Sequence, residues 1–237
     1  MGRSRRRRVV IVAIASVVAT ACIALGVWQM ERLADRRALN AEIRAGRSAP
    51  PTRVRTAEDI GALSAFRPVV VEGTYDIEGE VLLYGRSLDG EPGHHVVTPL
   101  ALDDGSGVLV VRGWVPFRIE SAPVPEAAPP VRDVVVEGWL IAAERRGRST
   151  PDSDGIVRTL DFSGIGERLP FELAPLAIQL RDQDPPPSRL PVPVPAAELS
   201  EGPHLSYAIQ WFAFAGVAVA GAGILLRRER GSATAAP

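Results

Sequence analysis

A histidine and two aromatic residues stand at helical spacing where the last long apolar segment of the chain begins. His204, Tyr207, Ala208 and Trp211 occur at i, i+3, i+4 and i+7, so a helix that starts near Pro203 places them on one face. An imidazole beside aromatic rings can hold a flat, apolar ring system and ligate its metal through a ring nitrogen. The same residues can equally form an aromatic belt at a membrane surface. Spacing alone leaves both interpretations open.

The other two histidines are neighbours in sequence. His94 and His95 enter an extended, β-branched run. Adjacent residues of a strand point to opposite faces, so the pair cannot bind one ion without a bend in the backbone. We interpret both as structural or hydrogen-bonding residues.

Arg112-Gly113-Trp114 ends the strongest of the extended runs. The arginine can pair with a carboxylate of the protein or with a propionate of a ligand. Glycine allows another backbone segment to approach closely, and tryptophan supplies a large buried area. Arg112 is therefore a weaker candidate for ligand binding, and a structural role at a strand end is the alternative.

Motifs that would carry catalysis are absent from the sequence. It contains no glycine-rich phosphate loop, no zinc-protease helix and no Gly-x-Ser-x-Gly elbow. Its acidic residues are scattered in turns such as Asp103-Asp104, where solvated loop residues are the simplest interpretation. We therefore expect a protein that is not an enzyme.

Two apolar segments must position these residues. Residues 9–28 and 207–226 are each predominantly apolar over about 30 Å of helix, the thickness of a hydrocarbon core. Only a helix satisfies its own backbone polar groups in lipid, so both segments are predicted transmembrane helices. In the second, Ala213, Gly216, Ala220 and Gly223 form a small-residue face that could pack against Ala15 and Ala19 of the first or against another subunit.

Arginine residues indicate the orientation. Five precede the first apolar segment in residues 1–8, and three follow the second in residues 227–237. Basic flanks stay on the cytoplasmic side, which predicts a multi-pass cell-membrane protein with both tails inside and residues 29–206 outside. The middle has 19 arginines against 27 acidic residues, a net charge of −8, which argues against nucleic acid as a partner.

A cleaved N-terminal segment is the competing interpretation of the first apolar run. Ala19-Thr20-Ala21-Cys22 has the form of a degenerate lipoprotein box. The apolar run, however, continues past Cys22 to Trp28 and then passes into a helical pattern, which favours an uncleaved anchor. Cys22 is the only cysteine, so the predicted outer domain holds no disulfide.

The middle region divides by composition into a helical extension (29–46), a β core (66–182) and a proline-rich strap (183–203). Thr56 and Asp59 have capping-box spacing for a short helix between the first two. We expect strands at 67–75, 81–86, 94–102, 108–115, 134–141, 156–160 and 177–181, and a short helix at 162–169. Asp103–Gly107 is a predicted hairpin turn.

Two of the predicted strands are near-copies. Val69-Val-Val-Glu-Gly73 recurs as Val134-Val-Val-Glu-Gly138, which is compatible with two similar β units in one sheet or with coincidence. The predicted fold is a membrane protein in which two transmembrane α-helices flank an extracytoplasmic, mainly antiparallel β domain, α+β in class and barrel- or sandwich-like.

Four passages, in this order, resemble the surfeit locus protein one family, the membrane-bound assembly factors of cytochrome c oxidase. They are Gly26-Val-Trp-Gln-Met-Glu-Arg32, Gly93-His-His-Val-Val-Thr-Pro-Leu100, Val108-Leu-Val-Val-Arg-Gly-Trp-Val-Pro116 and His204-Leu-Ser-Tyr-Ala-Ile-Gln-Trp-Phe212. The motif residues of the first two passages are Trp28, Gln29, Arg32, Thr98 and Pro99. The resemblance covers nearly the whole chain.

The resemblance implies a role in building the largest subunit of the oxidase, at heme a insertion or at stabilisation of an early intermediate. It implies heme a as the cofactor, His204 as the ligand of the heme iron, and Tyr207 and Trp211 as its neighbours. The partners expected on this basis are the membrane, the largest oxidase subunit and, second, heme a synthase. The oligomeric state is left open.

Two other classes of function compete with this one. An extracytoplasmic sensor or binding module of the cell envelope would need a ligand pocket in the β domain. A membrane-anchored hydrolase would need a nucleophile and a base, which the motifs do not supply.

Overall fold

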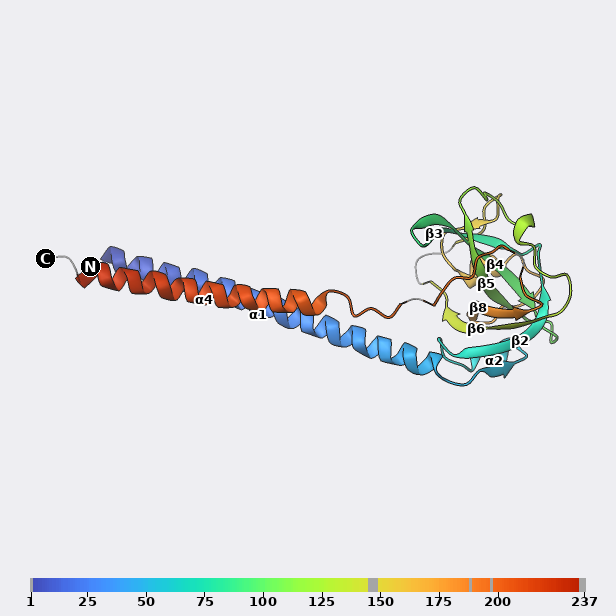
Figure 1. Ribbon diagram of the computed structural model, residues 1–237, viewed down its shortest axis with the longest axis horizontal. Helices are drawn as coiled ribbons and strands as arrows, with labels where there is room; N and C mark the ends of the chain where they lie inside the picture. The colour runs from blue at the N-terminus through green and yellow to red at the C-terminus, as the bar shows by residue number, and fades with distance from the viewer. Residues whose placement is uncertain (1, 145–148, 188, 197, 235–237) are drawn as a thin grey trace. The chain divides into compact units, whose positions relative to one another are not determined.

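The computed structural model describes residues 2–144, 149–187, 189–196 and 198–234 (Figure 1). Parts of the predicted tails (1 and 235–237), of the β core (145–148) and of the strap (188 and 197) lie outside the described residues. The chain forms two compact units, a helical unit of Met1–Glu42 with Glu198–Pro237 and a sheet unit of Ile43–Ala197.

The helical unit contains most of α1 and all of α4, the two longest helices of the described chain; the last turn of α1, from Ile43, belongs to the sheet unit. α1 runs over Gly2–Arg47 and α4 over His204–Thr234. Their apolar stretches, within Arg5–Arg47 and His204–Arg228, have mean hydropathies of 2.7 and 1.9 and are long and apolar enough to cross a membrane. The predicted continuation of the first helix beyond residue 28 is confirmed. α1 ends at Arg47, where both the hydroxyl and the backbone N–H of Ser48 donate to the carbonyl of Arg44, at 2.8 and 3.0 Å.

Small residues form the contact between α1 and α4. Ala19 and Cys22 of α1 form a buried cluster with Ala215 of α4, and Trp211 packs against it. Gly26 continues this face of α1, and a Cβ on it would lie 2.6 Å from the ring of Phe212. The spacing of three and four residues is that of helices packed at a shallow angle.

The prediction that the small-residue face of Gly216, Ala220 and Gly223 packs against the first helix was wrong. A Cβ on Gly216 or Gly223 would have no described atom within 4 Å, and Ala220 is exposed. α4 carries two small-residue faces about one residue apart, and periodicity cannot distinguish them. The contact uses the face that contains Ala215, whereas the prediction for Ala19 on α1 is confirmed.

The sheet unit is built on one mixed sheet of eight strands in the described chain (Figure 1). The strands are β1 Thr52–Val54, β2 Pro68–Tyr75, β3 Val81–Leu88, β4 Glu91–Ala101, β5 Gly107–Pro116, β6 Val134–Ala142, β7 Ile156–Val157 and β8 Leu176–Asp184. Their order is β1-β2-β6-β8-β5-β4-β3-β7. β2 also pairs with β4, so β2, β6, β8, β5 and β4 form a closed ring of hydrogen-bonded pairs.

Strands are present at all seven predicted positions, although β7 covers only Ile156–Val157 of the predicted 156–160. The short helices α2 (Ala57–Gly61) and α3 (Phe162–Gly166) are also present. The capping box at Thr56 and Asp59 is confirmed, with Thr56 Oγ1 accepting from the backbone N–H of Asp59 at 3.0 Å. The near-copies are direct antiparallel partners, because Val69 pairs with Gly138 and Gly73 with Val134.

Parallel pairing was not foreseen. β1 pairs with β2, β3 with β7 and β5 with β8 in parallel. These ladders are short, and β1 has only three residues, too few to give a periodic pattern in the sequence.

Side chains from all five ring strands gather in one core, with Val71, Leu100, Val110, Val136 and Ile178 among them. Alternate residues of the same strands face the other way, as strand geometry requires. Leu109 and Val111 thus belong to a second core, which includes Ile165 of α3. The domain is therefore packed on both faces of its central strands.

The proline-rich strap is bonded to β5. Trp114 and Val192 exchange backbone hydrogen bonds of 2.7 and 2.9 Å. A Cβ on Gly113 would lie 2.5 Å from the carbonyl oxygen of Val192, so a glycine is needed for this approach. The role predicted for Gly113 is thus observed, and the segment it receives is the strap.

Candidate functional site

The first turn of α4 places His204 against α1. Its ring Nδ1 lies 2.8 Å from Oε1 of the Gln29 side chain. An amide oxygen only accepts hydrogen bonds, so in the neutral form of this imidazole the contact with Oε1 places the proton on Nδ1. Nε2 then carries the lone pair and is the nitrogen able to ligate a metal.

The space beside that nitrogen is kept clear by a glycine. Gly202 adopts a left-handed conformation, with φ of +69°. A Cβ built on it would lie 3.4 Å from Cδ2 and 3.5 Å from Nε2 of His204. A side chain at this position would therefore stand in van der Waals contact with this edge of the imidazole and cover part of it.

Three polar contacts hold the segment before α4 on the helical extension of α1. Arg37 donates two hydrogen bonds to the carboxylate of Glu201, at 3.0 and 2.9 Å. The hydrogen bond and charge of Glu201 raise the pKa of Arg37. The buried Asn40 donates to the carbonyl of Ser200 at 3.2 Å. Together these contacts fix His204 relative to Gln29.

The aromatic residues of the predicted stripe lie in different surroundings. Tyr207 is about half exposed, as is Trp28 of the first motif on α1. Trp211 packs on the Ala19 and Cys22 cluster and meets Phe214 edge to face at 5.9 Å. Of the set predicted from spacing, His204 and Trp211 contact α1, while Tyr207 leaves much of its ring free.

The first and fourth motifs of the resemblance thus meet in the helical unit. Gln29 contacts His204, and Gly26 gives room to Phe212. Arg32 of the first motif forms an exposed ion pair with Asp35 at 3.4 Å. The sequence predicted Gln29 only as a motif residue, because no local pattern links it to a histidine 175 positions away.

Arg112, by contrast, is buried inside the sheet unit. Its Nη1 lies 3.2 Å from Oε2 of Glu80, and both side chains are 1 % exposed. Nη2 donates to the carbonyl of Ala127 at 2.8 Å, and the guanidinium lies over the Tyr75 ring at 5.2 Å. The hydroxyl of Thr98 donates to the same Glu80 oxygen at 2.6 Å.

This network accounts for the second and third motifs. Burial lowers the pKa of Arg112, an effect that Tyr75 and Glu80 oppose, and burial raises the pKa of Tyr75. Pro99 accepts a backbone hydrogen bond from Asp76 at 2.9 Å. A carboxylate of the protein is the observed partner of Arg112, and Glu80 was not identified from sequence because it belongs to no motif.

The two neighbouring histidines lie on opposite faces of β4, as predicted. The His94 ring contacts Tyr84 and Phe117, with centroids 5.4 and 4.7 Å away. His95 lines a cavity of about 400 Å³ with Leu83, Arg86 and Gln179 among its walls. Burial lowers the pKa of His94, and burial with the charge of Arg86 lowers that of His95 to about 4. Both are therefore neutral at physiological pH.

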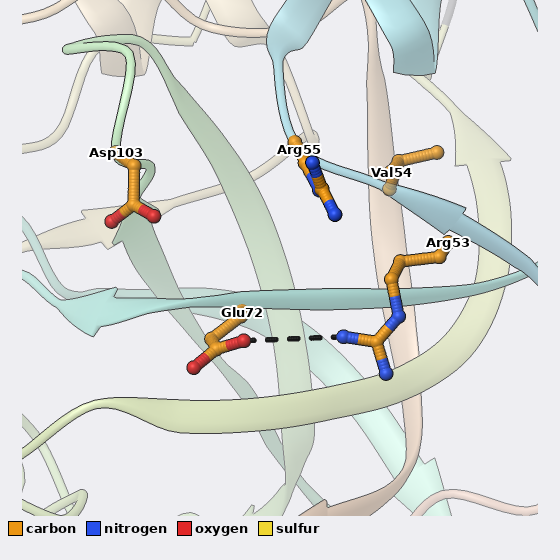
Figure 2. Close-up of a pocket in the computed structure, with 5 residues that line it drawn as sticks. All are labelled: Arg53, Val54, Arg55, Glu72 and Asp103. Carbon is orange, nitrogen blue, oxygen red and sulfur yellow. Dashed lines mark ion pairs between the residues drawn. The ribbon is translucent and has the colours of Figure 1, made fainter.

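A more polar cleft of about 290 Å³ lies at the edge strand β1 (Figure 2). Arg53 and Glu72 form an ion pair of 3.9 Å there, and Arg55 and Asp103 complete two positive and two negative side chains. Its charges balance, so it offers no strong preference for an ion of either sign. Among the described residues, no group of three or more His, Cys, Asp or Glu could hold a metal ion.

Comparison with known proteins places these features in a family. The model of the SURF1 family matches residues 16–216, which include Gln29, Arg112 and His204. A SURF1-like protein of Mycobacterium tuberculosis is 30 % identical over 213 residues, covering 86 % of this chain and 78 % of the relative. SURF1-like proteins of Rickettsia felis and Monosiga brevicollis are 25 % and 28 % identical, over 83 % and 88 % of this chain and 88 % and 84 % of theirs. The chain belongs to the SURF1 family.

Proposed function

We propose that this protein is a membrane-anchored, non-enzymatic assembly factor for a heme-copper cytochrome oxidase. It acts on the largest subunit, at heme a insertion or while an early intermediate is stabilised. Family membership supports this role in general terms. The observation that carries it for this chain is the contact between Gln29 and His204, which joins two distant motifs into one potential ligand site.

In this proposal α1 and α4 cross the cell membrane, and both arginine-rich tails lie in the cytoplasm. The sheet unit lies outside, where the closed ring of β2, β6, β8, β5 and β4 acts as a small barrel. His204 and Gln29 then lie at the outer membrane surface, near the exposed rings of Trp28 and Tyr207.

The residues at this site fit heme a. Nε2 of His204 has its lone pair available, and the absence of a side chain on Gly202 leaves room beside it. The half-exposed Tyr207 offers an aromatic surface to a flat apolar ring, and Trp211 supports the helix behind it. When bound, heme a would supply an iron that the imidazole of His204 could ligate. Arg112 has no part in the proposed site, because Glu80 already holds it.

Docking on the largest oxidase subunit would use the free face of α4. Ala213, Gly216, Ala220 and Gly223 lie on this face, away from the Ala215 contact with α1. Small residues allow two helices to approach closely in lipid, where packing drives association. Heme a synthase is the second partner that this face could receive.

Extraction in mild detergent tests the docking step. We expect the largest oxidase subunit to co-purify with the full-length protein, and replacement of both Gly216 and Gly223 by leucine to reduce its recovery at least several-fold. Val217 and Ile224 are exposed and each follows one of these glycines by one residue, about 100° around the helix, so the double leucine variant at those positions is the matched control and should retain the subunit.

Recovery of the protein without any oxidase subunit would contradict this proposal. It would favour the alternative of an envelope sensor or binding module, for which the cavity beside His95 is the available pocket.

A further inference from the structure

The partner of His204 is a side chain with both a donor and an acceptor. Gln29 presents its oxygen, Oε1, to Nδ1 of the imidazole at 2.8 Å. A neutral imidazole without such a partner can carry its proton on either nitrogen. Which nitrogen is free for a metal is decided by the hydrogen bond that the other one makes.

We propose that Gln29 is a positioning residue for His204. It holds the proton on Nδ1, fixes the plane of the ring and thereby presents the Nε2 lone pair on the side that Gly202 leaves open. The effect of Gln29 on heme binding rests on the proposed function, whereas its effect on the position of the imidazole proton does not.

Neighbouring contacts support this arrangement. Gln29 is partly buried on the side of α1 that also carries Gly26 and Leu33, both buried. Arg37–Glu201 and Asn40–Ser200 fasten the segment that leads into α4. His204 is therefore positioned both through its backbone, by the contacts of the preceding segment, and through its ring Nδ1, by Gln29. Side chains that orient a metal-binding histidine in this way typically change metal affinity by about 10- to 100-fold when replaced.

A purely structural hydrogen bond between two helices is the rival interpretation. It predicts that replacing Gln29 changes the stability of the helical unit and leaves the proton distribution of the imidazole as it was. The two interpretations differ in a measurement on the protein without heme.

The experiment uses the full-length protein in detergent micelles with ¹⁵N-labelled histidine. The chain has three histidines, so the His204→Ala variant assigns the signals of His204 by difference. In the wild type we expect a protonated Nδ1 and an unprotonated Nε2. Gln29→Leu should shift the proton toward Nε2, while Gln29→Glu, which keeps an acceptor at the same length, should retain it on Nδ1.

Gln210→Leu is the matched control, because Gln210 is an exposed glutamine of α4. It should leave the His204 signals unchanged. If Gln29→Leu folds and leaves the proton on Nδ1, the positioning role is overturned, whatever happens to heme binding. If Gln29→Leu does not fold, loss of the Nδ1 proton in Gln29→Glu overturns it instead.

Titration with ferric heme b then separates this inference from the proposed function. We expect Gln29→Leu to raise the dissociation constant about 10- to 100-fold, with Gln29→Glu and Gln210→Leu close to the wild type. A wild type that binds no heme, together with the expected ¹⁵N shifts, would remove heme from the proposal and leave the positioning of His204 standing. Equal affinities in all four proteins would overturn the effect of positioning on ligation.

Discussion

Replacing Arg112 by leucine is expected to destabilise the sheet unit by about 3–5 kcal/mol. The change leaves the carboxylate of Glu80 in an interior where both side chains are 1 % exposed. Thr98 and the backbone N–H of Val124 would still donate to that carboxylate, but its charge would be uncompensated. Urea unfolding of the full-length protein in non-ionic detergent, followed by the β-sheet signal in circular dichroism, measures the loss.

Two comparisons show whether burial is the cause. Arg181→Leu removes an arginine whose pair with Glu137, at 2.8 Å, is open to solvent, with side chains 55 % and 31 % exposed, and it should cost less than about 1 kcal/mol. The double variant Glu80→Gln with Arg112→Met removes both charges and should be more stable than Arg112→Leu alone. A loss below 1 kcal/mol for Arg112→Leu would show that the network is not important for stability.

The second large effect is expected at His204. Protein with alanine at this position, purified from a host that makes heme a, should carry at least ten times less heme than the wild type. The reason is that the variant removes the nitrogen that Gln29 and Gly202 leave available for the iron. Absorption spectra of the two purified proteins give the heme content directly.

The other two histidines provide the controls. His94 and His95 belong to β4 of the sheet unit, and the variants His94→Ala and His95→Ala should retain wild-type heme content. Equal heme in His204→Ala and the wild type would remove His204 from the proposed site. Loss of heme only in a variant of β4 would place the ligand in the sheet unit.

Local features of the fold could be predicted from the sequence. The helical extension of α1, the capping box at Thr56 and the hairpin turn between β4 and β5 each depend on residues close together in the chain. The β-branched runs likewise indicate strands, because alternating side chains must cover two faces. Such signals require no knowledge of distant partners.

Contacts between distant residues could not be predicted. Gln29 with His204, Glu80 with Arg112 and Trp114 with Val192 each join segments whose local patterns are independent of one another. The sequence also could not show which of two small-residue faces of α4 packs on α1. Only the position of α1 in the structure distinguishes Ala215, which contacts it, from Gly216, which does not. Tertiary packing decided all of these.

The motifs of the resemblance have two separate physical roles in the structure. Those around Gln29 and His204 build a potential ligand site in the helical unit. Those around Thr98 and Arg112 stabilise the interior of the sheet unit, where Gly113 and Trp114 also receive the strap. Arg112 was a candidate for ligand binding from sequence, and its burial explains its place in a motif without any ligand.

The most direct test of the assembly role is the amount of assembled oxidase in cells that lack this gene. We predict that the spectral signal of the aa3-type oxidase falls strongly, that heme a synthesis persists, and that the wild-type gene restores the oxidase. Unchanged oxidase levels and spectra in the deletion strain would contradict the proposed function.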